Sequence, residues 1–121
     1  MPLPTDFSLD IPIFAKLYDF YKNLSQVIAS FPKTKRYTLG QKLDSFTLET
    51  FELLFSISTD TNKSKTLGKI SIKLDLLKTL LRLAKDTHSV KSEDYLELQM
   101  ALSEIGRMLG GWIRATKQNL S

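Results

Sequence analysis

Hydrophobic residues recur every three or four positions along most of the chain, a spacing that gathers them on one face of an α-helix. The first stripe predicts a helix over residues 11–30, which Pro32 ends because proline cannot continue a helix. Further stripes predict helices over about 39–59, 64–87 and 93–118. No segment shows the sustained alternation with a period of two that is typical of a strand. The chain is therefore predicted to be all-α.

Short polar segments separate the predicted helices. Thr38-Leu39-Gly40-Gln41 has the Thr-x-x-Gln form of a capping box and predicts the start of the second helix. Residues 59–62 and 88–92 predict the two later breaks, since their polar side chains compete with the helical backbone for hydrogen bonds. Helices with such short connections most simply pack as an antiparallel up-down-up-down four-helix bundle. We expect one domain over residues 1–121, with a short flexible segment at 1–9.

The second and third predicted helices each carry more apolar residues than one stripe needs. A helix in a lone bundle buries one face, so a second stripe has two interpretations. Either these helices are central and bury both faces within one protomer, or the extra faces mediate self-association, because such residues would otherwise form a sticky exposed patch. We favour a homo-oligomer. The predicted interface residues are Leu48, Phe51 and Phe55 on the second helix, and Ile72, Leu76, Leu80 and Leu83 on the third.

Composition narrows the class of protein. Hydrophobic residues make up 42% and charged residues 25% of the chain, a balance typical of globular proteins. No apolar run reaches the roughly 18 residues that a spanning helix needs. The start of the chain has neither the basic region nor the apolar region of a secretory signal, so we expect a soluble, cytoplasmic protein without a membrane partner. The lack of cysteine excludes disulfides, thiolate metal sites and a cysteine nucleophile.

Residues suited to catalysis are sparse. His88 is the only histidine, and the Glu-x-x-His pairs of a bundle di-metal site do not occur. Asp86 lies two residues from His88, but no nucleophile accompanies them. Gly106, Gly110 and Gly111 lack the Gly-Lys-Ser/Thr ending of a phosphate-binding loop. We therefore predict no enzyme activity, no catalytic residue, no metal and no cofactor, and we ascribe the glycines to close approach of a neighbouring helix or of the Trp112 ring.

Positive charge is concentrated in three segments. Residues 61–91 carry a net charge of +6, residues 31–43 carry +4, residues 105–121 carry +3, and the remainder carries −9. Such segregation can guide a polyanion to one face, although ordinary solvated helix faces are the alternative. Rows of basic residues neutralise phosphates without specifying sequence, which predicts salt-sensitive RNA or DNA binding. The candidates are Lys33, Lys35, Arg36, Lys69, Lys73, Lys78, Arg82, Lys85, Arg107, Arg114 and Lys117. Tyr37 is either a packing residue or a platform for an unpaired base.

Two segments resemble a known family of four-helix proteins. Residues 31–43, which include Arg36-Tyr37-Thr38-Leu39-Gly40, are similar to proteins encoded within intervening sequences of ribosomal RNA genes. Residues 104–113, which include Gly106-Arg107-Met108-Leu109-Gly110-Gly111-Trp112-Ile113, are similar to the last helix of the accessory variability determinant (Avd) proteins of diversity-generating retroelements. The four-helix layout extends this resemblance over the whole chain.

The resemblance to the Avd proteins implies a function. It implies a homopentameric barrel with a basic surface, which binds the reverse transcriptase and template RNA of the element and supports error-prone cDNA synthesis. On this view Arg107 and Arg114 would meet polymerase or RNA together with Lys78, Arg82 and Lys85, and the extra apolar faces would form the pentamer seam. The resemblance of residues 36–40 to the intervening-sequence branch implies instead an oligomer of undefined role, structural or nucleic-acid-binding.

Overall fold

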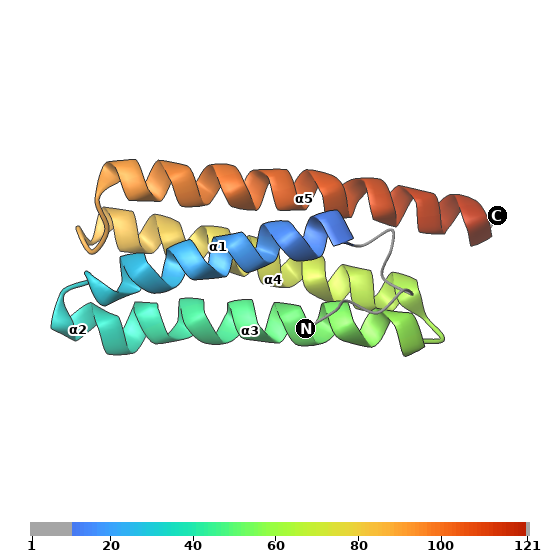
Figure 1. Ribbon diagram of the computed structural model, residues 1–121, viewed down its shortest axis with the longest axis horizontal. Coiled ribbons are helices and arrows are strands. Elements are labelled where there is room, and N and C mark those ends of the chain that lie inside the picture. The colour runs from blue at the N-terminus through green and yellow to red at the C-terminus, as the bar shows by residue number, and fades with distance from the viewer. Residues whose placement is uncertain (1–10, 121) are drawn as a thin grey trace.

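Four long helices lie side by side in the computed structural model, which describes residues 11–120 (Figure 1). They are α1 (Ile11–Ala29), α3 (Gln41–Ser56), α4 (Lys63–Asp86) and α5 (Ser92–Leu120). The segment expected to be flexible, 1–9, lies outside the described residues. Within residues 11–120 all regular structure is helical, which confirms the all-α class and the four-helix layout. The predicted boundaries of α1 and α4 agree with the structure to within one residue.

Each long helix packs against two others. α1 contacts α3 and α5, and α4 contacts the same two helices. In Figure 1 the chain runs from right to left in α1, back to the right in α3, to the left in α4 and to the right in α5. This arrangement accounts for the second apolar side of α3 in part, since Phe51 and Phe55 pack against Phe14 of α1. The second apolar side of α4 stays largely exposed in the protomer.

The core lies along the apolar stripes of the four long helices. The stripe residues Leu17, Leu67 and Leu98 are fully buried, and the other core positions follow the same helical spacing. At the centre of α3 the buried stripe is polar, because Thr47 and Thr50 occupy it. Their hydroxyls donate to the carbonyls one turn earlier, at 2.8 Å and 2.7 Å, so neither hydroxyl is left unpaired in the core. The core residues are Ile13, Leu17, Phe20, Leu24, Val27, Phe31, Leu43, Leu54, Ile57, Leu67, Ile70, Leu74, Leu77, Leu81, Ala84, Leu98, Leu102, Ile105 and Leu109.

The helix that follows α1 begins earlier than predicted. Its first turn is α2 (Lys33–Lys35), after which the backbone forms a π-helical turn, η2 (Arg36–Gly40), and continues directly into α3. The predicted capping box is wrong, because the Thr38 hydroxyl donates to the Thr34 carbonyl at 3.1 Å instead of accepting a hydrogen bond from a backbone N–H. Gly40 is buried against α1, and a Cβ atom placed on it would lie 2.9 Å from Cγ2 of Ile28. This contact between helices fixes the π turn in place.

The two later connections are short and closed by local hydrogen bonds. α3 ends in a 3₁₀ turn, η3 (Ile57–Thr59), and the Asn62 side chain caps α4 by accepting from the Lys65 backbone N–H at 3.1 Å. α4 ends at Asp86, and His88, two residues further along the chain, has a φ of 59°. The N–H of Ser89 donates to the Ala84 carbonyl at 2.8 Å, and the N–H of His88 donates to the Lys85 carbonyl at 3.0 Å. These two bonds form a Schellman motif with a histidine where glycine is usual.

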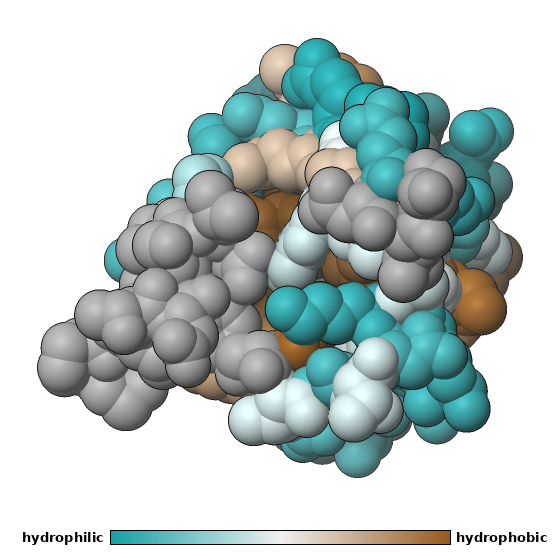
Figure 2. Space-filling model, turned by 90° about the vertical axis from the view of Figure 1, so that its right-hand side faces the viewer, coloured by the Kyte–Doolittle hydropathy of each residue, from teal (hydrophilic) through white to brown (hydrophobic). Residues whose placement is uncertain are grey.

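Hydrophilic residues form most of the rim of the bundle end at which α3 passes into α4, with hydrophobic residues between the helices (Figure 2). Among the described residues, no helix is both long and apolar enough to cross a membrane. In the same range, no group of three or more histidine, cysteine or acidic residues is arranged to hold a metal ion. His88 thus ends a helix rather than forming part of a metal cluster within residues 11–120.

Candidate nucleic-acid interface

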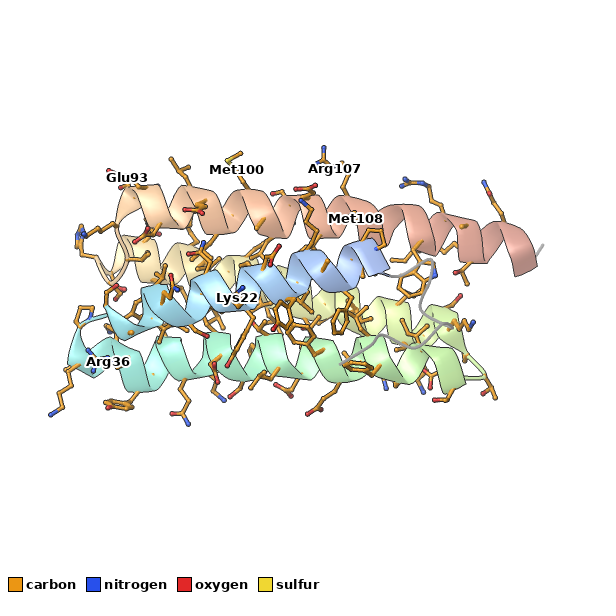
Figure 3. The ribbon with its side chains drawn as sticks, viewed as in Figure 1. Lys22, Arg36, Glu93, Met100, Arg107 and Met108 are labelled. Atoms are coloured by element: carbon orange, nitrogen blue, oxygen red, sulfur yellow. The ribbon has the colours of Figure 1, made fainter. Side chains whose placement is uncertain are left out.

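A groove of about 270 Å³ runs between α4 and α5 and brings two of the predicted basic residues together. Lys78 of α4 and Arg107 of α5 line it, together with Gly106 and Gly110 and with the carboxylate of Asp75. Arg107 is exposed and points away from the bundle (Figure 3). The remaining lining residues are Ser71, Leu74, Ser103, Leu109 and Ile113. We call this feature the α4–α5 groove.

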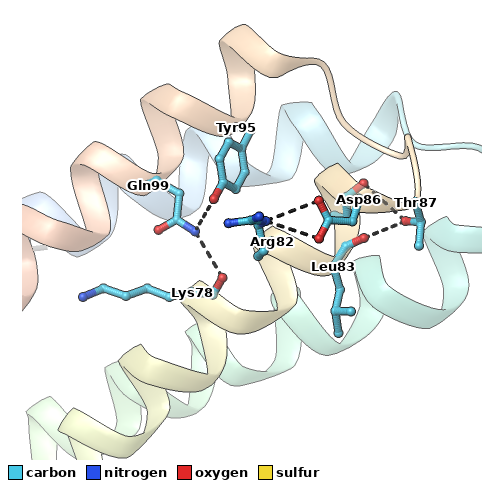
Figure 4. Close-up of polar contacts among 8 residues, drawn as sticks. Lys78, Arg82, Leu83, Asp86, Thr87, Tyr95 and Gln99 are labelled. Atoms are coloured by element: carbon cyan, nitrogen blue, oxygen red, sulfur yellow. Dashed lines mark hydrogen bonds and ion pairs between the residues drawn. The ribbon is translucent and has the colours of Figure 1, made fainter.

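Polar contacts across α4 and α5 hold the groove in shape (Figure 4). The side-chain amide of Gln99 donates to the Lys78 carbonyl at 3.1 Å and lies 3.4 Å from the Tyr95 hydroxyl. The ammonium of Lys85 lies 4.9 Å from the centroid of the Tyr95 ring, a cation–π distance. Lys85 is therefore partly engaged within the protomer, whereas the Lys78 side chain extends along the groove.

Arg82 lies on the same side of α4 but is paired. Its Nε atom is 3.2 Å and 3.3 Å from the two carboxylate oxygens of Asp86, one turn along the helix. The hydrogen bond to Asp86, followed by the carboxylate charge, raises the pKa of Arg82 above its ordinary value. Because both side chains are exposed, the pair contributes little to stability and leaves Arg82 able to exchange Asp86 for a phosphate.

The glycines of α5 face basic side chains. The atom nearest to a Cβ placed on Gly106 is Nζ of Lys78, at 3.6 Å. The corresponding neighbours of Gly110 and Gly111 are the guanidinium nitrogens of Arg114, at 3.6 Å and 3.8 Å. The predicted close approach of another helix or of the Trp112 ring is thus not found within the described protomer. The glycines instead form a bare backbone strip over which Lys78 and Arg114 extend.

Lys69 and Lys73 lie on the opposite side of α4, toward α3. They line a groove of about 470 Å³ together with Glu49 and Leu53 of α3. Nζ of Lys73 is 3.4 Å from Oε1 of Glu49 and 4.4 Å from the centroid of the Phe46 ring. The charge of Lys73 is therefore largely balanced within the protomer, and Lys69 is the exposed cation on this side.

The basic residues that follow α1 lie at one end of the bundle (Figure 3). Lys33 is exposed and Lys35 is half-buried. Nη2 of Arg36 donates to the Phe31 carbonyl at 3.2 Å, and its Nε is buried without a hydrogen-bond partner among the described residues. Arg36 therefore helps to end α1. Lys117 is exposed near the C-terminal end of α5, so the eleven predicted cations do not form one continuous surface.

The seven predicted interface residues lie on two different sides of the protomer. Phe51 and Phe55 face α1, where the Phe14 ring meets them edge-on at centroid distances of 5.5 Å and 5.2 Å. Leu48 lies one turn before Phe51 and two turns before Phe55 on α3, and it is exposed. Phe51 is therefore largely accounted for by packing within the protomer. The other residues lie on α4, where Leu80 is partly buried and Ile72, Leu76 and Leu83 remain exposed. We call these three exposed residues the α4 stripe.

An exposed apolar pair on α5 was missed by the sequence analysis. Leu96 and Met100 lie one turn apart on the outer face of α5, with Met100 72% exposed and pointing away from the bundle (Figure 3). Their spacing of four residues, offset from the core stripe that begins at Leu98, is the signal that could have identified them. Arg107 lies on the same outer side of the helix.

The fold and these surfaces define an all-helical protein whose candidate sites are the basic α4–α5 groove and the exposed apolar stripes. Comparison with known families then places it. The chain belongs to the bAvd-like family, which it matches over residues 12–116, and this is a family of accessory, non-catalytic proteins. No curated protein matches the chain. The match confirms the resemblance to the Avd proteins and includes most or all of each of the four long helices.

Proposed function

We propose that the protein is the accessory protein of a diversity-generating retroelement, which binds the reverse transcriptase and template RNA of the element and supports mutagenic cDNA synthesis. Membership of the bAvd-like family carries this proposal. The α4–α5 groove supplies a binding surface, because Lys78 and Arg107 line it and the Arg114 guanidinium lies over the adjacent glycine backbone. Basic side chains over bare backbone suit a phosphate-rich ligand.

We further propose that the protomers, each an antiparallel four-helix bundle, assemble into a ring. The resemblance implies five protomers in this ring. A ring requires heterologous contacts, in which two different surfaces of neighbouring protomers meet. The α4 stripe and the Leu48–Phe55 side of α3 are two such surfaces, since one lies along α4 and the other lies on α3 beside α1. Their separation favours a closed ring over a symmetric dimer built on one patch.

The test compares charge variants of the groove with a matched control. In K78E/R107E each substitution reverses a charge in the α4–α5 groove, and in K63E/K65E each reverses an exposed charge in the first turn of α4. We expect K78E/R107E to reduce RNA affinity. The slope of the logarithm of the binding constant against the logarithm of the salt concentration should become shallower by about 0.7 for each lost phosphate contact. The variant should also reduce cDNA synthesis in a reaction with reverse transcriptase and template RNA. Equal effects of both variants, or cDNA synthesis that does not depend on the protein, would contradict the proposal.

The intervening-sequence branch remains the second candidate, favoured by residues 36–40. On that hypothesis the protein is a structural or nucleic-acid-binding oligomer without a reverse transcriptase. Genome context separates the two. A reverse-transcriptase gene beside near-identical repeats supports the retroelement, and a position inside a ribosomal RNA gene supports the alternative.

A further inference from the structure

A hollow of about 510 Å³ opens beside Tyr37 at the bundle end, where η2 continues into α3. This volume lies within the range of about 300–1,000 Å³ that is typical of small-ligand sites. The Tyr37 ring forms one wall, and Gln41, Lys42 and Ser45 supply polar groups. Thr38 and Leu39 complete the lining. The site is separate from the α4–α5 groove, because every lining residue belongs to η2 or α3.

Tyr37 is exposed to an extent that packing does not explain. It is 64% exposed, and within residues 11–120 its ring stacks on no other side chain and its hydroxyl has no hydrogen-bond partner. Other tyrosines of the chain are engaged. The Tyr21 hydroxyl donates to Asp44 at 2.7 Å, and the Tyr95 ring lies beneath Lys85. A free ring beside a hollow is a surface on which a planar group can stack.

The backbone holds Tyr37 in a fixed position. The next residue, Thr38, donates its hydroxyl to the Thr34 carbonyl at 3.1 Å, and Gly40 is buried against Ile28 of α1. Because the π-helical turn is held by these contacts at Thr38 and Gly40, directly after Tyr37, the exposed ring is presented to solvent rather than free to collapse onto the bundle. Single π turns are frequent at functional sites.

All charged residues in the segment of chain that leads to the hollow are positive. Residues 20–43 contain five lysines and arginines and no acidic residue. Lys33 lies one turn before Tyr37 in the same helical run, and Lys42 lines the hollow. The first acid beyond this segment, Asp44, accepts the hydrogen bond of Tyr21. An anionic ligand with a planar group therefore fits this end of the molecule better than an acidic or purely apolar peptide.

We propose that this hollow binds single-stranded RNA, with one unpaired base stacked on Tyr37 and the flanking phosphates on Lys33 and Lys42. Gln41 and Ser45 offer hydrogen bonds to the edge of the base. A basic surface combined with an aromatic platform is the arrangement with which proteins bind unpaired strands. The inference rests on the proposed function in one respect, the choice of RNA as the ligand.

The experiment measures the fluorescence anisotropy of a labelled 12-nucleotide single strand and of the duplex of the same sequence. The variants are Y37A, Y37W and the control Y18A. Tyr18 is a matched control because it is 54% exposed and lies on α1 beneath Lys22. We expect Y37A to weaken single-strand binding about 5- to 150-fold, Y37W to retain it, and duplex binding to stay unchanged. Because Tyr37 is exposed, all variants should unfold at the temperature of the wild type.

Three results would overturn the inference. The first is a Y37A variant that binds the single strand as the wild type does. This result would overturn the inference even if the variant no longer binds reverse transcriptase. The second is an equal loss of single-strand and duplex binding, and the third is an equal effect of Y18A. These outcomes are independent of the K78E/R107E test. If K78E/R107E loses cDNA synthesis while Y37A binds the single strand normally, the proposed function stands and the Tyr37 site is refuted. If K78E/R107E keeps cDNA synthesis while Y37A loses single-strand binding, only the Tyr37 site is supported.

Discussion

The α4 stripe provides the sharpest test of assembly. Ile72, Leu76 and Leu83 are 61%, 39% and 45% exposed in the protomer. Full burial of such a side chain contributes about 1.5–3 kcal/mol, so burying the exposed fractions of all three contributes about 2–4 kcal/mol to each interface. Replacing the three residues with serine removes this contribution. The dissociation constant of the oligomer should then rise by about 30- to 1,000-fold.

Sedimentation velocity over a range of protein concentrations measures this change directly. The matched control replaces Leu96 and Met100 with serine, since these residues are 59% and 72% exposed but lie on the outer face of α5. The control should assemble as the wild type does. Both variants should keep the helical circular dichroism of the wild type, because the substituted side chains lie outside the core. If the α4 variant shows the mass of the wild type at every concentration, the stripe does not mediate self-association.

Substitutions at three further positions test local features of the fold. Gly40→Ala should lower the free energy of unfolding by about 1–2 kcal/mol in urea titration, because the new Cβ lies 2.9 Å from Cγ2 of Ile28; a rise would contradict the close packing. At His88, whose φ is 59°, glycine should be tolerated and valine should cost about 1–2 kcal/mol in thermal unfolding; equal stability of both variants would contradict the assigned helix end. The hydrogen bond to Asp44, aided by burial, raises the pKa of Tyr21 above its ordinary value. As the pH rises, the folded state therefore keeps this proton to a higher pH than the unfolded state does. The stability that the Tyr21–Asp44 hydrogen bond contributes is complete below the unfolded pKa of about 10 and is lost as the pH rises through the folded pKa. Between about pH 9 and 11 the wild type should lose more stability than Tyr21→Phe, and parallel pH profiles would refute this assignment.

The four helices follow from the sequence because each buries one periodic stripe, and the stripe is a local property. The start of the second helix does not. Thr38-Leu39-Gly40-Gln41 has the form of a capping box, but Gly40 packs against Ile28 of α1 and the backbone continues as a π turn. This contact joins segments that are distant in sequence, and tertiary packing overrides the local signal. The second apolar side of α3 has the same explanation, because Phe51 and Phe55 meet Phe14.

The candidate interface was predicted only as far as single helices determine it. The helical spacing correctly separates Lys69 and Lys73 from Lys78, because successive residues turn by about 100° around the axis. Which charges are available to a partner depends on contacts between helices. Lys73 is balanced by Glu49 of α3, whereas Lys78 reaches a groove that Arg107 of α5 completes. No pattern along one helix contains this information.

The glycine strip of α5 connects stability with binding. Alanine is better than glycine in a helix by about 1 kcal/mol, and a Cβ on Gly106 or Gly110 would lie 3.6 Å from Lys78 or Arg114, an ordinary contact. Packing within the protomer therefore does not require these glycines. We expect G106A/G110A to unfold at a higher temperature, by roughly 2–8 °C for each substitution, and to bind RNA or reverse transcriptase more weakly. A stabilised variant with unchanged binding would show that no partner needs the bare glycine strip. A destabilised variant would show that the glycines are needed within the protomer, to leave room for the extended side chains of Lys78 and Arg114.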